Sequence, residues 1–301
     1  MAERNYIPAV RVSGILFVAA LALLSAAKLG AQGRGQVPAP AASSNAPAKS
    51  TALRDLTGYW VSVVTEEWRY RMVVPDKGDY LTNVPLNAEG RKVAEAWDPA
   101  KDQASGNQCK GYGAAAIMYV PGRLHIYWQD DNTLRIDTDS GTQTRLLHFG
   151  GAVPEPKTSD WQGVSAARWG DDEPIAQRIL GGGPLGQGGP EYEADVAGGF
   201  GGNQTARAEG FKPPARNYLH VTTTHMRPGY LHKNGVPYGA NATLDEYFTN
   251  LTYDGTDWLF LTGVVTDPQY LMEPYIFHTH YKKLPDNSGW DPTPCRADEP
   301  R

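Results

Sequence analysis

The stretch that decides the fold class is residues 123–149, RLHIYWQDDNTLRIDTDSGTQTRLLHF. Apolar side chains stand at every second position on both sides of its first turn, and they are Leu124, Ile126, Trp128, Leu134 and Ile136. Alternation with period two is typical of a strand with one buried and one solvent-facing side. Asp130-Asp131-Asn132 and Asp139-Ser140-Gly141 supply turn residues between the apolar runs. The stretch therefore predicts three consecutive strands of an antiparallel sheet.

Further strands are expected on both sides of this meander. Their ranges are 57–64, 68–74, 115–120, 165–169, 218–225, 243–252, 257–266 and 275–283. Asp254-Gly255 lies between two of them and is a strong hairpin signal. One helix is expected after Asn87, a residue type that caps helices well, and it stops at Pro99. We therefore predict an all-β fold, an antiparallel barrel or strongly curved sheet with one short helix.

The N-terminus has the features of a secretion signal, residues 1–31. Arg4 and Arg11 supply positive charge, and an uncharged apolar run follows from Val12 to Ala27. A membrane-spanning helix needs roughly 20 apolar residues, so the shorter run favours a cleaved signal over an uncleaved anchor. We therefore expect a periplasmic or secreted protein with no stable membrane span after cleavage.

The rest of the chain is expected to form one domain behind a linker. Residues 32–52 are rich in Pro, Ala and Ser and predict a flexible tether, so the domain would cover 53–301. Residues 181–202 contain ten Gly, a composition that offers little side-chain area for a packed core. We expect a long insertion loop over 171–215, which is either a lid over a site or a surface excursion.

Two cysteines, Cys109 and Cys295, stand far apart in the sequence. Outside the cytoplasm they can oxidise to a disulfide that would pin the C-terminal tail to an early segment of the domain. The alternative is a pair of buried, unpaired thiols. Two cysteines are too few for a four-cysteine zinc site.

The sequence lacks the signals of several function classes. The net charge of −5 argues against a nucleic-acid binder, which usually carries a basic stripe. The chain has no Gly-x-Ser-x-Gly elbow, and its Gly-rich stretch lacks the Gly-Lys-Ser/Thr ending of a phosphate-binding loop. No cofactor is expected, although a metal site is kept below as an alternative.

Two segments of the sequence resemble known groups of proteins. Gly58-Tyr59-Trp60 at the start of the first expected strand resembles the Gly-x-Trp opening of lipocalin-like barrels, in which the Trp closes one end and the other end opens to a ligand. Stretches across residues 55–295 resemble a large group of exported, mostly uncharacterised bacterial β-rich proteins. The second resemblance implies export and one domain, and it brings no catalytic residues.

Three titratable side chains are candidates for proton transfer: His225, Glu246 and His278. His225 follows a strand end, where binding groups collect in barrels, and histidine suits proton transfer near neutral pH. Glu246 shares a strand face with Phe248, so it lies inside the barrel if Phe248 does; outward placement in water is the alternative. His278 and His280 share one face of a strand and could instead hold a metal with a third ligand, unless that face is simply exposed to solvent.

The candidate substrate-binding residues are arginines and tyrosines. Arg69 and Arg71 would share one strand face and hold an anionic or phenolic group; a solvated rim is the alternative. The others surround the expected barrel mouth or line its wall, and they are Arg227, Tyr230 and Tyr247.

Together these residues favour a small-molecule pocket inside a hollow barrel. We expect a cofactor-free acid–base lyase or isomerase that acts on an aromatic or apolar compound. The alternatives are a non-catalytic binding protein for an apolar ligand and an envelope structural protein. The oligomeric state is left open.

Overall fold

The computed structural model describes residues 46–79, 84–151, 160–170 and 217–298. The expected signal peptide over 1–31, most of the tether expected over 32–52 and the insertion expected over 171–215 lie outside the described residues. All described residues belong to one unit, Ser44–Arg301.

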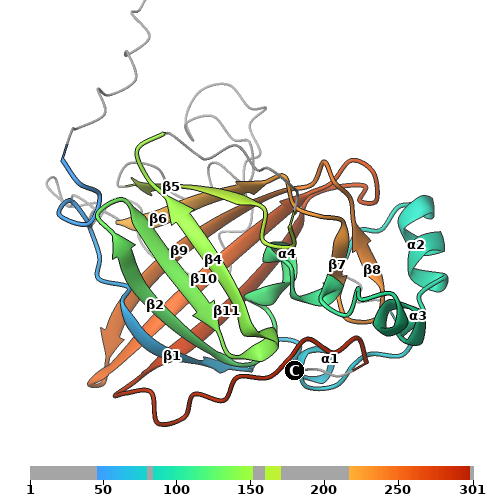
Figure 1. Ribbon diagram of the computed structural model, residues 1–301, viewed down its shortest axis with the longest axis horizontal. Coiled ribbons are helices and arrows are strands. Elements are labelled where there is room, and N and C mark those ends of the chain that lie inside the picture. Colours follow the sequence, from blue (N-terminus) through green and yellow to red (C-terminus); the bar gives the residue numbers. More distant parts are fainter. Residues whose placement is uncertain (1–45, 80–83, 152–159, 171–216, 299–301) are drawn as a thin grey trace, which may run out of the picture. The chain divides into compact units, whose positions relative to one another are not determined.

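Nine strands form a closed barrel in the order β1, β11, β10, β9, β6, β5, β4, β3, β2 (Figure 1). Their bounds are β1 (Gly58–Val63), β2 (Arg123–Asp130), β3 (Thr133–Thr138), β4 (Gln143–His148), β5 (Val164–Gly170), β6 (Tyr218–Thr224), β9 (Thr243–Tyr253), β10 (Thr256–Thr266) and β11 (Tyr275–Leu284). β1 pairs with both β2 and β11, so the sheet closes on itself. The expectation of a barrel is confirmed.

One pair of neighbouring strands departs from the antiparallel arrangement that we expected throughout. β4 and β5 run parallel and share two residue pairs, Leu147 with Ser165 and His148 with Ala166. Parallel neighbours need a crossover of about a dozen residues or more, and the connection over 149–163 is long enough to supply it. The barrel is therefore mixed, unlike the up-and-down antiparallel barrels of lipocalins.

The meander over residues 123–149 folds as its alternation predicts. Ile126 pairs with Ile136 across β2 and β3, and both side chains are buried. The turn of the β9–β10 hairpin also follows its signal, because Asp254 and Gly255 both have positive φ, at 48° and 68°. Two positive φ values in sequence are the requirement of the tight hairpin turn that Asp-Gly favours.

The barrel interior is a packed hydrophobic core, not the hollow container that we expected. Trp60, Phe248 and Tyr281 are among its largest side chains and are each at most 1% exposed. Packing is tight at Gly263, where a Cβ atom would lie 2.2 Å from the Phe277 ring. The hollows described below lie at one end of the barrel and on its outer wall.

Within the described ranges, four short helices replace the single helix predicted. They are α1 (Trp68–Met72), α2 (Ala88–Glu95), α3 (Pro99–Ala104) and α4 (Ala114–Ile117). α2 is the expected helix, and its Asn87 cap accepts a hydrogen bond from Gly90 N at 2.8 Å. α3 begins at Pro99, which ends one helical pattern and opens another because proline suits a first helical position.

The strands predicted over 68–74 and 115–120 are wrong, because these residues form α1 and α4 instead. In α1 the side chain of Arg71 turns inward and is buried, while Trp68 and Met72 are 58% and 45% exposed. A strand would have put Trp68 and Met72 on one face and Arg71 on the other. The hydrogen bonds that the buried Arg71 side chain makes, described below, favour the helical conformation of this segment.

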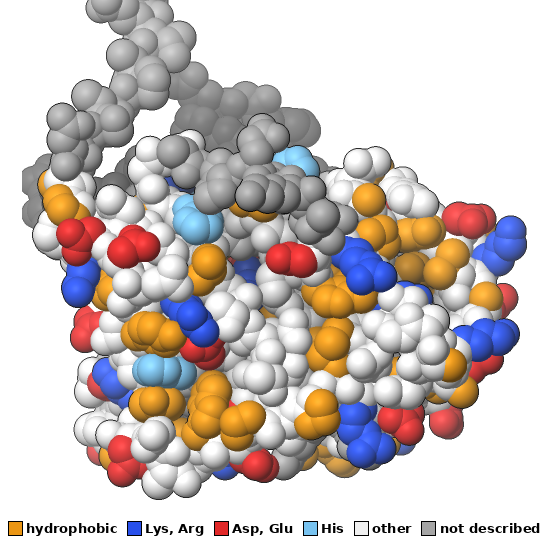
Figure 2. Space-filling view, in the orientation of Figure 1, with side chains coloured by type: hydrophobic (Ala, Val, Ile, Leu, Met, Phe, Trp, Pro, Cys, Tyr) orange, Lys and Arg blue, Asp and Glu red, His pale blue; other side chains and the backbone are white. Residues whose placement is uncertain are grey.

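A smaller assembly lies beside the barrel end. The hairpin of β7 (Gly229–His232) and β8 (Val236–Tyr238) packs near α2, and Figure 1 places α4 between this hairpin and the barrel. Figure 2 shows Lys and Arg side chains interspersed with Asp and Glu over α2 and α3. Ion pairs such as Lys101 with Asp98, at 3.3 Å, contribute to this mixed surface.

The described chain meets the barrel before the boundary expected at residue 53. Ala48 N donates to Asn132 Oδ1 at 2.9 Å, and Lys49 N donates to Asp131 O at 3.0 Å. Both acceptors belong to the turn between β2 and β3, where strand pairing leaves polar groups available. The C-terminal end of the expected tether is therefore part of the folded unit.

The predicted disulfide is present. Cys109 and Cys295 are bonded, with their Cα atoms 5.1 Å apart across a sequence separation of 186 residues. The bridge fastens the segment after β11 to the turn between α3 and α4.

A buried ion pair crosses the core. Arg145 on β4 donates from Nη1 to Glu246 Oε1 on β9 at 2.8 Å, and its Nη2 donates to Glu246 Oε2. Both side chains have zero exposure, so of the two alternatives for Glu246 the structure shows the inward one, beside Phe248. Thr223 Oγ1 accepts a further hydrogen bond from Arg145 at 3.3 Å.

We predict that Glu246→Gln lowers the free energy of unfolding by about 3–5 kcal/mol, because it leaves the guanidinium buried without its counter-charge. Urea unfolding at pH 7 measures the change. The matched control is the double variant Arg145→Met/Glu246→Leu, which removes both charges and should recover most of the loss. A Glu246→Gln protein as stable as the wild type would contradict the assignment.

Candidate functional site

The three residues expected to transfer protons lie in three separate places. His225 follows β6, is exposed, and its Nδ1 is 2.9 Å from Thr224 Oγ1. Glu246 is inside the core, and His278 lies on the outer face of β11, where its Nδ1 is 3.0 Å from Thr262 Oγ1. The structure does not bring them together around one cavity.

Arg227 and Tyr230 brace the segment between β6 and β7. Tyr230 OH donates to Asp102 Oδ2 at 2.8 Å, and burial raises the pKa of this phenol. Arg227 donates to Asn107 Oδ1 at 2.8 Å and covers the Trp161 ring at 4.2 Å. We expected the guanidinium and the phenol of these two side chains to contact a substrate. In the structure the same groups hold neighbouring loops in place.

Tyr247 and the two histidines of β11 lie on the outer wall of the barrel. Tyr247 stacks on His220, with ring centroids 4.7 Å apart. His278 and His280 share one face, as period two predicts, and His280 Nδ1 is 3.1 Å from Glu66 Oε1. Among the residues that the structure describes, no three His, Cys, Asp or Glu side chains are grouped so that they could hold a metal ion.

Arg71 anchors α1 to the barrel end. Its Nε donates to Tyr119 O at 2.9 Å, and its Nη2 donates to Thr279 Oγ1 at 3.0 Å. Its Nη1 lies 3.7 Å from Glu66 Oε2, and the guanidinium covers the Tyr119 ring at 4.5 Å. Arg69, the other arginine of the expected pair, is exposed, so the helix separates two side chains that a strand would have aligned.

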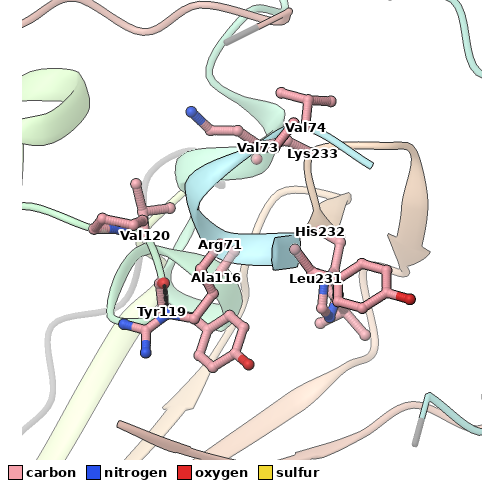
Figure 3. Close-up of a pocket in the computed structure, with 12 residues that line it drawn as sticks. Arg71, Val73, Val74, Ala116, Tyr119, Val120, Leu231, His232 and Lys233 are labelled. Carbon is pink, nitrogen blue, oxygen red and sulfur yellow. Dashed lines mark hydrogen bonds between the residues drawn. The ribbon is translucent and has the colours of Figure 1, made fainter. Parts of the chain in front are cut away.

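Beneath α1 is a narrow space, here called the inner cleft. Its lining comes from α1, α4 and β7 and includes Arg71, Val74, Ala116, Tyr119, Leu231 and His232. Figure 3 shows Arg71 beside Tyr119, with Leu231 and His232 on the other side of the cleft. The space amounts to about 30 Å³, enough for about two water molecules.

Two hydrogen-bonded pairs at the inner cleft join an acid–base group to a phenol. The Tyr119 hydroxyl donates to the Glu67 carboxylate, and His232 Nε2 lies 3.0 Å from Tyr275 OH. Glu67 has φ 49°, a left-handed conformation that is unfavourable for a residue with a Cβ atom. The residue with the strained backbone is therefore the one whose side chain binds the Tyr119 hydroxyl.

Burial shifts the titration of these groups. It lowers the pKa of His232 to about 4, and it raises the pKa of Tyr119 and Tyr275. The hydrogen bond to Glu67 raises the pKa of Tyr119 further. At neutral pH the neutral imidazole of His232 and the neutral phenol of Tyr119 therefore line the cleft, and the neutral phenol of Tyr275 is hydrogen-bonded to His232.

The pKa of His232 makes the stability of the protein depend on pH. Because its pKa is lower in the folded state, the stabilisation is complete above the unfolded value of 6.5 and is lost as the pH falls towards 4. Between pH 7 and pH 5 this group should lower the free energy of unfolding by about 2 kcal/mol. We predict that His232→Gln weakens this pH dependence by about that amount in urea unfolding at the two pH values. Equal pH dependence in both proteins would contradict the assignment.

A second hollow, here called the outer groove, lies on the other side of α1. Its apolar wall contains Val61, Val64, Trp68, Met72 and Pro121, and its polar floor contains Ser62, Gly122, Arg123, Asp139 and Ser140. Asp291 and Thr293 of the C-terminal segment complete the lining. The groove encloses about 490 Å³, within the range of small-molecule sites. Trp68 also borders a hollow of about 360 Å³, so it forms a ridge between two depressions.

The floor of the outer groove is fixed by hydrogen bonds. Asp139 accepts from the backbone N of Arg123 and of Ser140, each at 2.7 Å. Ser140 Oγ donates to Pro121 O at 2.7 Å, and Arg123 Nη1 lies 3.3 Å from Asp139 Oδ2. The polar side of the groove is therefore formed before any ligand arrives, as in most ligand sites.

The roles of Trp68, Met72 and Glu67 were not predicted, because the alternation over 68–74 favoured a strand. The available signal was the consecutive acidic pair Glu66-Glu67 directly before Trp68, since acidic residues are common at the start of a helix. The contribution of the C-terminal segment to the outer groove is not predictable from the sequence either, because a Cys109–Cys295 bridge places that segment near residue 109 and says nothing of Asp139.

Comparisons with known proteins add no relative: no family model, no curated protein and no solved structure matches the chain. The resemblances to lipocalin-like barrels and to exported bacterial proteins stay predictions. No helix within the described ranges is long and apolar enough to cross a membrane.

Proposed function

We propose that the protein binds a small, partly aromatic molecule in the outer groove. The observation that carries this proposal is Trp68, which is 58% exposed at the edge of a groove with a preformed polar floor. An indole ring is costly to leave in water and offers a flat surface for stacking. Because the barrel interior is filled, we now place the ligand site of the binding-protein alternative on the outer wall of the barrel.

The two sides of the groove define the ligand class. Trp68, Met72 and Val61 offer an apolar wall for a ring system. Among the polar lining residues, Arg123 offers a donor and Asp291 an acceptor. An aromatic molecule with one polar substituent fits this division better than a purely apolar one, because it would satisfy both sides.

Export to the periplasm or beyond the cell is part of the proposal. The Cys109–Cys295 disulfide supports it, because disulfides persist mainly in oxidising compartments. The signal features of residues 1–31 point in the same direction.

We predict that Trp68→Ala weakens ligand binding about tenfold, because it removes the stacking surface. The probes are 2-naphthol, 2-naphthoate and 2-naphthylamine, which share a ring system and carry a neutral hydroxyl, an anionic carboxylate and a neutral amine at pH 7. Isothermal titration calorimetry measures the affinities at pH 7. The matched control is Met272→Ala, which truncates a side chain that is 71% exposed and does not line the groove. Absence of binding by all three probes, or equal affinities of both variants and the wild type, would contradict the proposal.

The second candidate function is acid–base catalysis of the lyase or isomerase type. The Glu67–Tyr119 hydrogen bond favours it, because a carboxylate on a strained backbone that faces a phenol is an arrangement found at catalytic sites. His232 and Tyr275 provide a second proton-transfer pair nearby. Since the inner cleft is narrow, a substrate would have to be seated by movement of α1.

For this candidate we predict that the wild type converts, over hours, an aromatic compound whose side chain carries an acidic C–H beside a leaving group or a double bond. Liquid chromatography coupled to mass spectrometry detects the product, because the chromatography also separates isomers of equal mass. Glu67→Gln should abolish the conversion and leave the calorimetric affinity in the outer groove unchanged, since Glu67 does not line that groove. Binding without conversion would leave the protein a binder and remove the catalytic candidate.

A further inference from the structure

The C-terminal segment, residues 285–298, forms one wall of the outer groove. It follows β11, which ends at Leu284, and contains no helix or strand. Asp291 and Thr293 of this segment line the groove together with Trp68 and Met72 of α1. The width of the groove therefore depends on what holds a stretch of chain that belongs to no sheet.

Single hydrogen bonds and ring contacts hold the segment at the groove. Thr293 N donates to Asp139 O at 2.9 Å, and Thr142 Oγ1 donates to Thr293 O at 2.9 Å. Trp290 contacts Tyr59 edge-on, with ring centroids 6.0 Å apart. Single hydrogen bonds of this kind contribute only modestly to stability, because water offers similar partners to the released groups.

The disulfide acts at the far end of the same segment. Cys295 follows Thr293 by two residues and is 8% exposed. Its partner Cys109 lies before the 3₁₀ turn Lys110–Tyr112, which belongs to the assembly beside the barrel end. Without the covalent bond, only non-covalent contacts, such as those of Thr293 and Trp290, would hold the segment after Leu284 in place.

We propose that the Cys109–Cys295 disulfide controls ligand binding in the outer groove according to its redox state. In the oxidised protein the bridge holds the Asp291–Thr293 wall against Asp139, and the groove is complete. In the reduced protein the wall is released and affinity falls. This inference rests on the proposed function, because it assigns a regulation to the same groove.

The chemistry is thiol–disulfide exchange with a dithiol reductant. A thiolate of the dithiol attacks one sulfur of the bridge, and the other sulfur leaves as a thiolate and takes up a proton. The second thiol of the reductant then attacks the mixed disulfide. The protein ends with two thiols, having gained two electrons and two protons, and the reductant ends as a cyclic disulfide.

The test compares calorimetric affinity for the three naphthyl probes in the oxidised protein, in protein reduced with dithiothreitol, and in Cys109→Ser/Cys295→Ser. We expect about tenfold weaker binding in both bridge-free forms. Dithiothreitol should change nothing further in the double variant, which controls for effects of the reductant itself. Hydrogen exchange should become faster over 285–298 and stay unchanged over β9 and β10.

A second variant keeps the test decisive if the bridge-free forms lose their fold, which circular dichroism would show. Thr142→Val removes the hydrogen bond to Thr293 O and leaves the disulfide in place, so it should weaken binding about twofold to threefold in a folded protein. Its control is Thr252→Val, a surface threonine whose hydroxyl bonds Asp257 on the β9–β10 hairpin.

The outcomes separate the two claims. If the oxidised wild type binds no probe, or if Trp68→Ala binds as the wild type does, the proposed function fails. If the oxidised protein binds through Trp68 and the folded bridge-free forms bind equally well, the redox inference alone is overturned. An unchanged affinity of Thr142→Val would overturn it when the bridge-free forms do not fold.

Discussion

Pairing of β1 with both β2 and β11 is the constraint from which the rest of the structure follows. Closure gives every strand one face that must be filled, and Trp60 on β1 is fully buried there. Because large side chains and the Arg145–Glu246 pair occupy this space, no room is left for a ligand between them. The hollows of the described structure therefore lie at the barrel end and on the outer wall, where α1 separates the inner cleft from the outer groove.

Much of the fold could be predicted because its strands alternate clearly. Leu124, Ile126, Leu134 and Ile136 lie inward as their spacing indicates, and Asp254-Gly255 makes the expected turn. The parallel pairing of β4 and β5 could not be predicted, since strand direction depends on how a long connection returns and not on the pattern within either strand. The filled interior was also missed, because alternation shows which face is inward and says nothing of how completely side chains fill it.

The candidate site was harder to predict, since its residues meet through tertiary contacts. Arg71 was selected as a ligand-binding arginine, but its partners Tyr119 and Thr279 are distant in sequence and turn it into the anchor of a helix. The sequence leaves both an inward and an outward position open for Glu246, and nothing near it in sequence indicates that Arg145 is its partner. The disulfide was predictable because the chain offers only one possible pair, Cys109 with Cys295.

The parallel pairing of β4 and β5 has a consequence for how the chain can vary. This junction contains two residue pairs, whereas β5 and β6 share seven. Connections of considerable length adjoin β5 on both sides, over 149–163 and 171–217. Insertions, deletions or relocated termini at this junction would leave every antiparallel ladder in register, so it is the natural place for related barrels to differ in length and for circular permutation to be attempted.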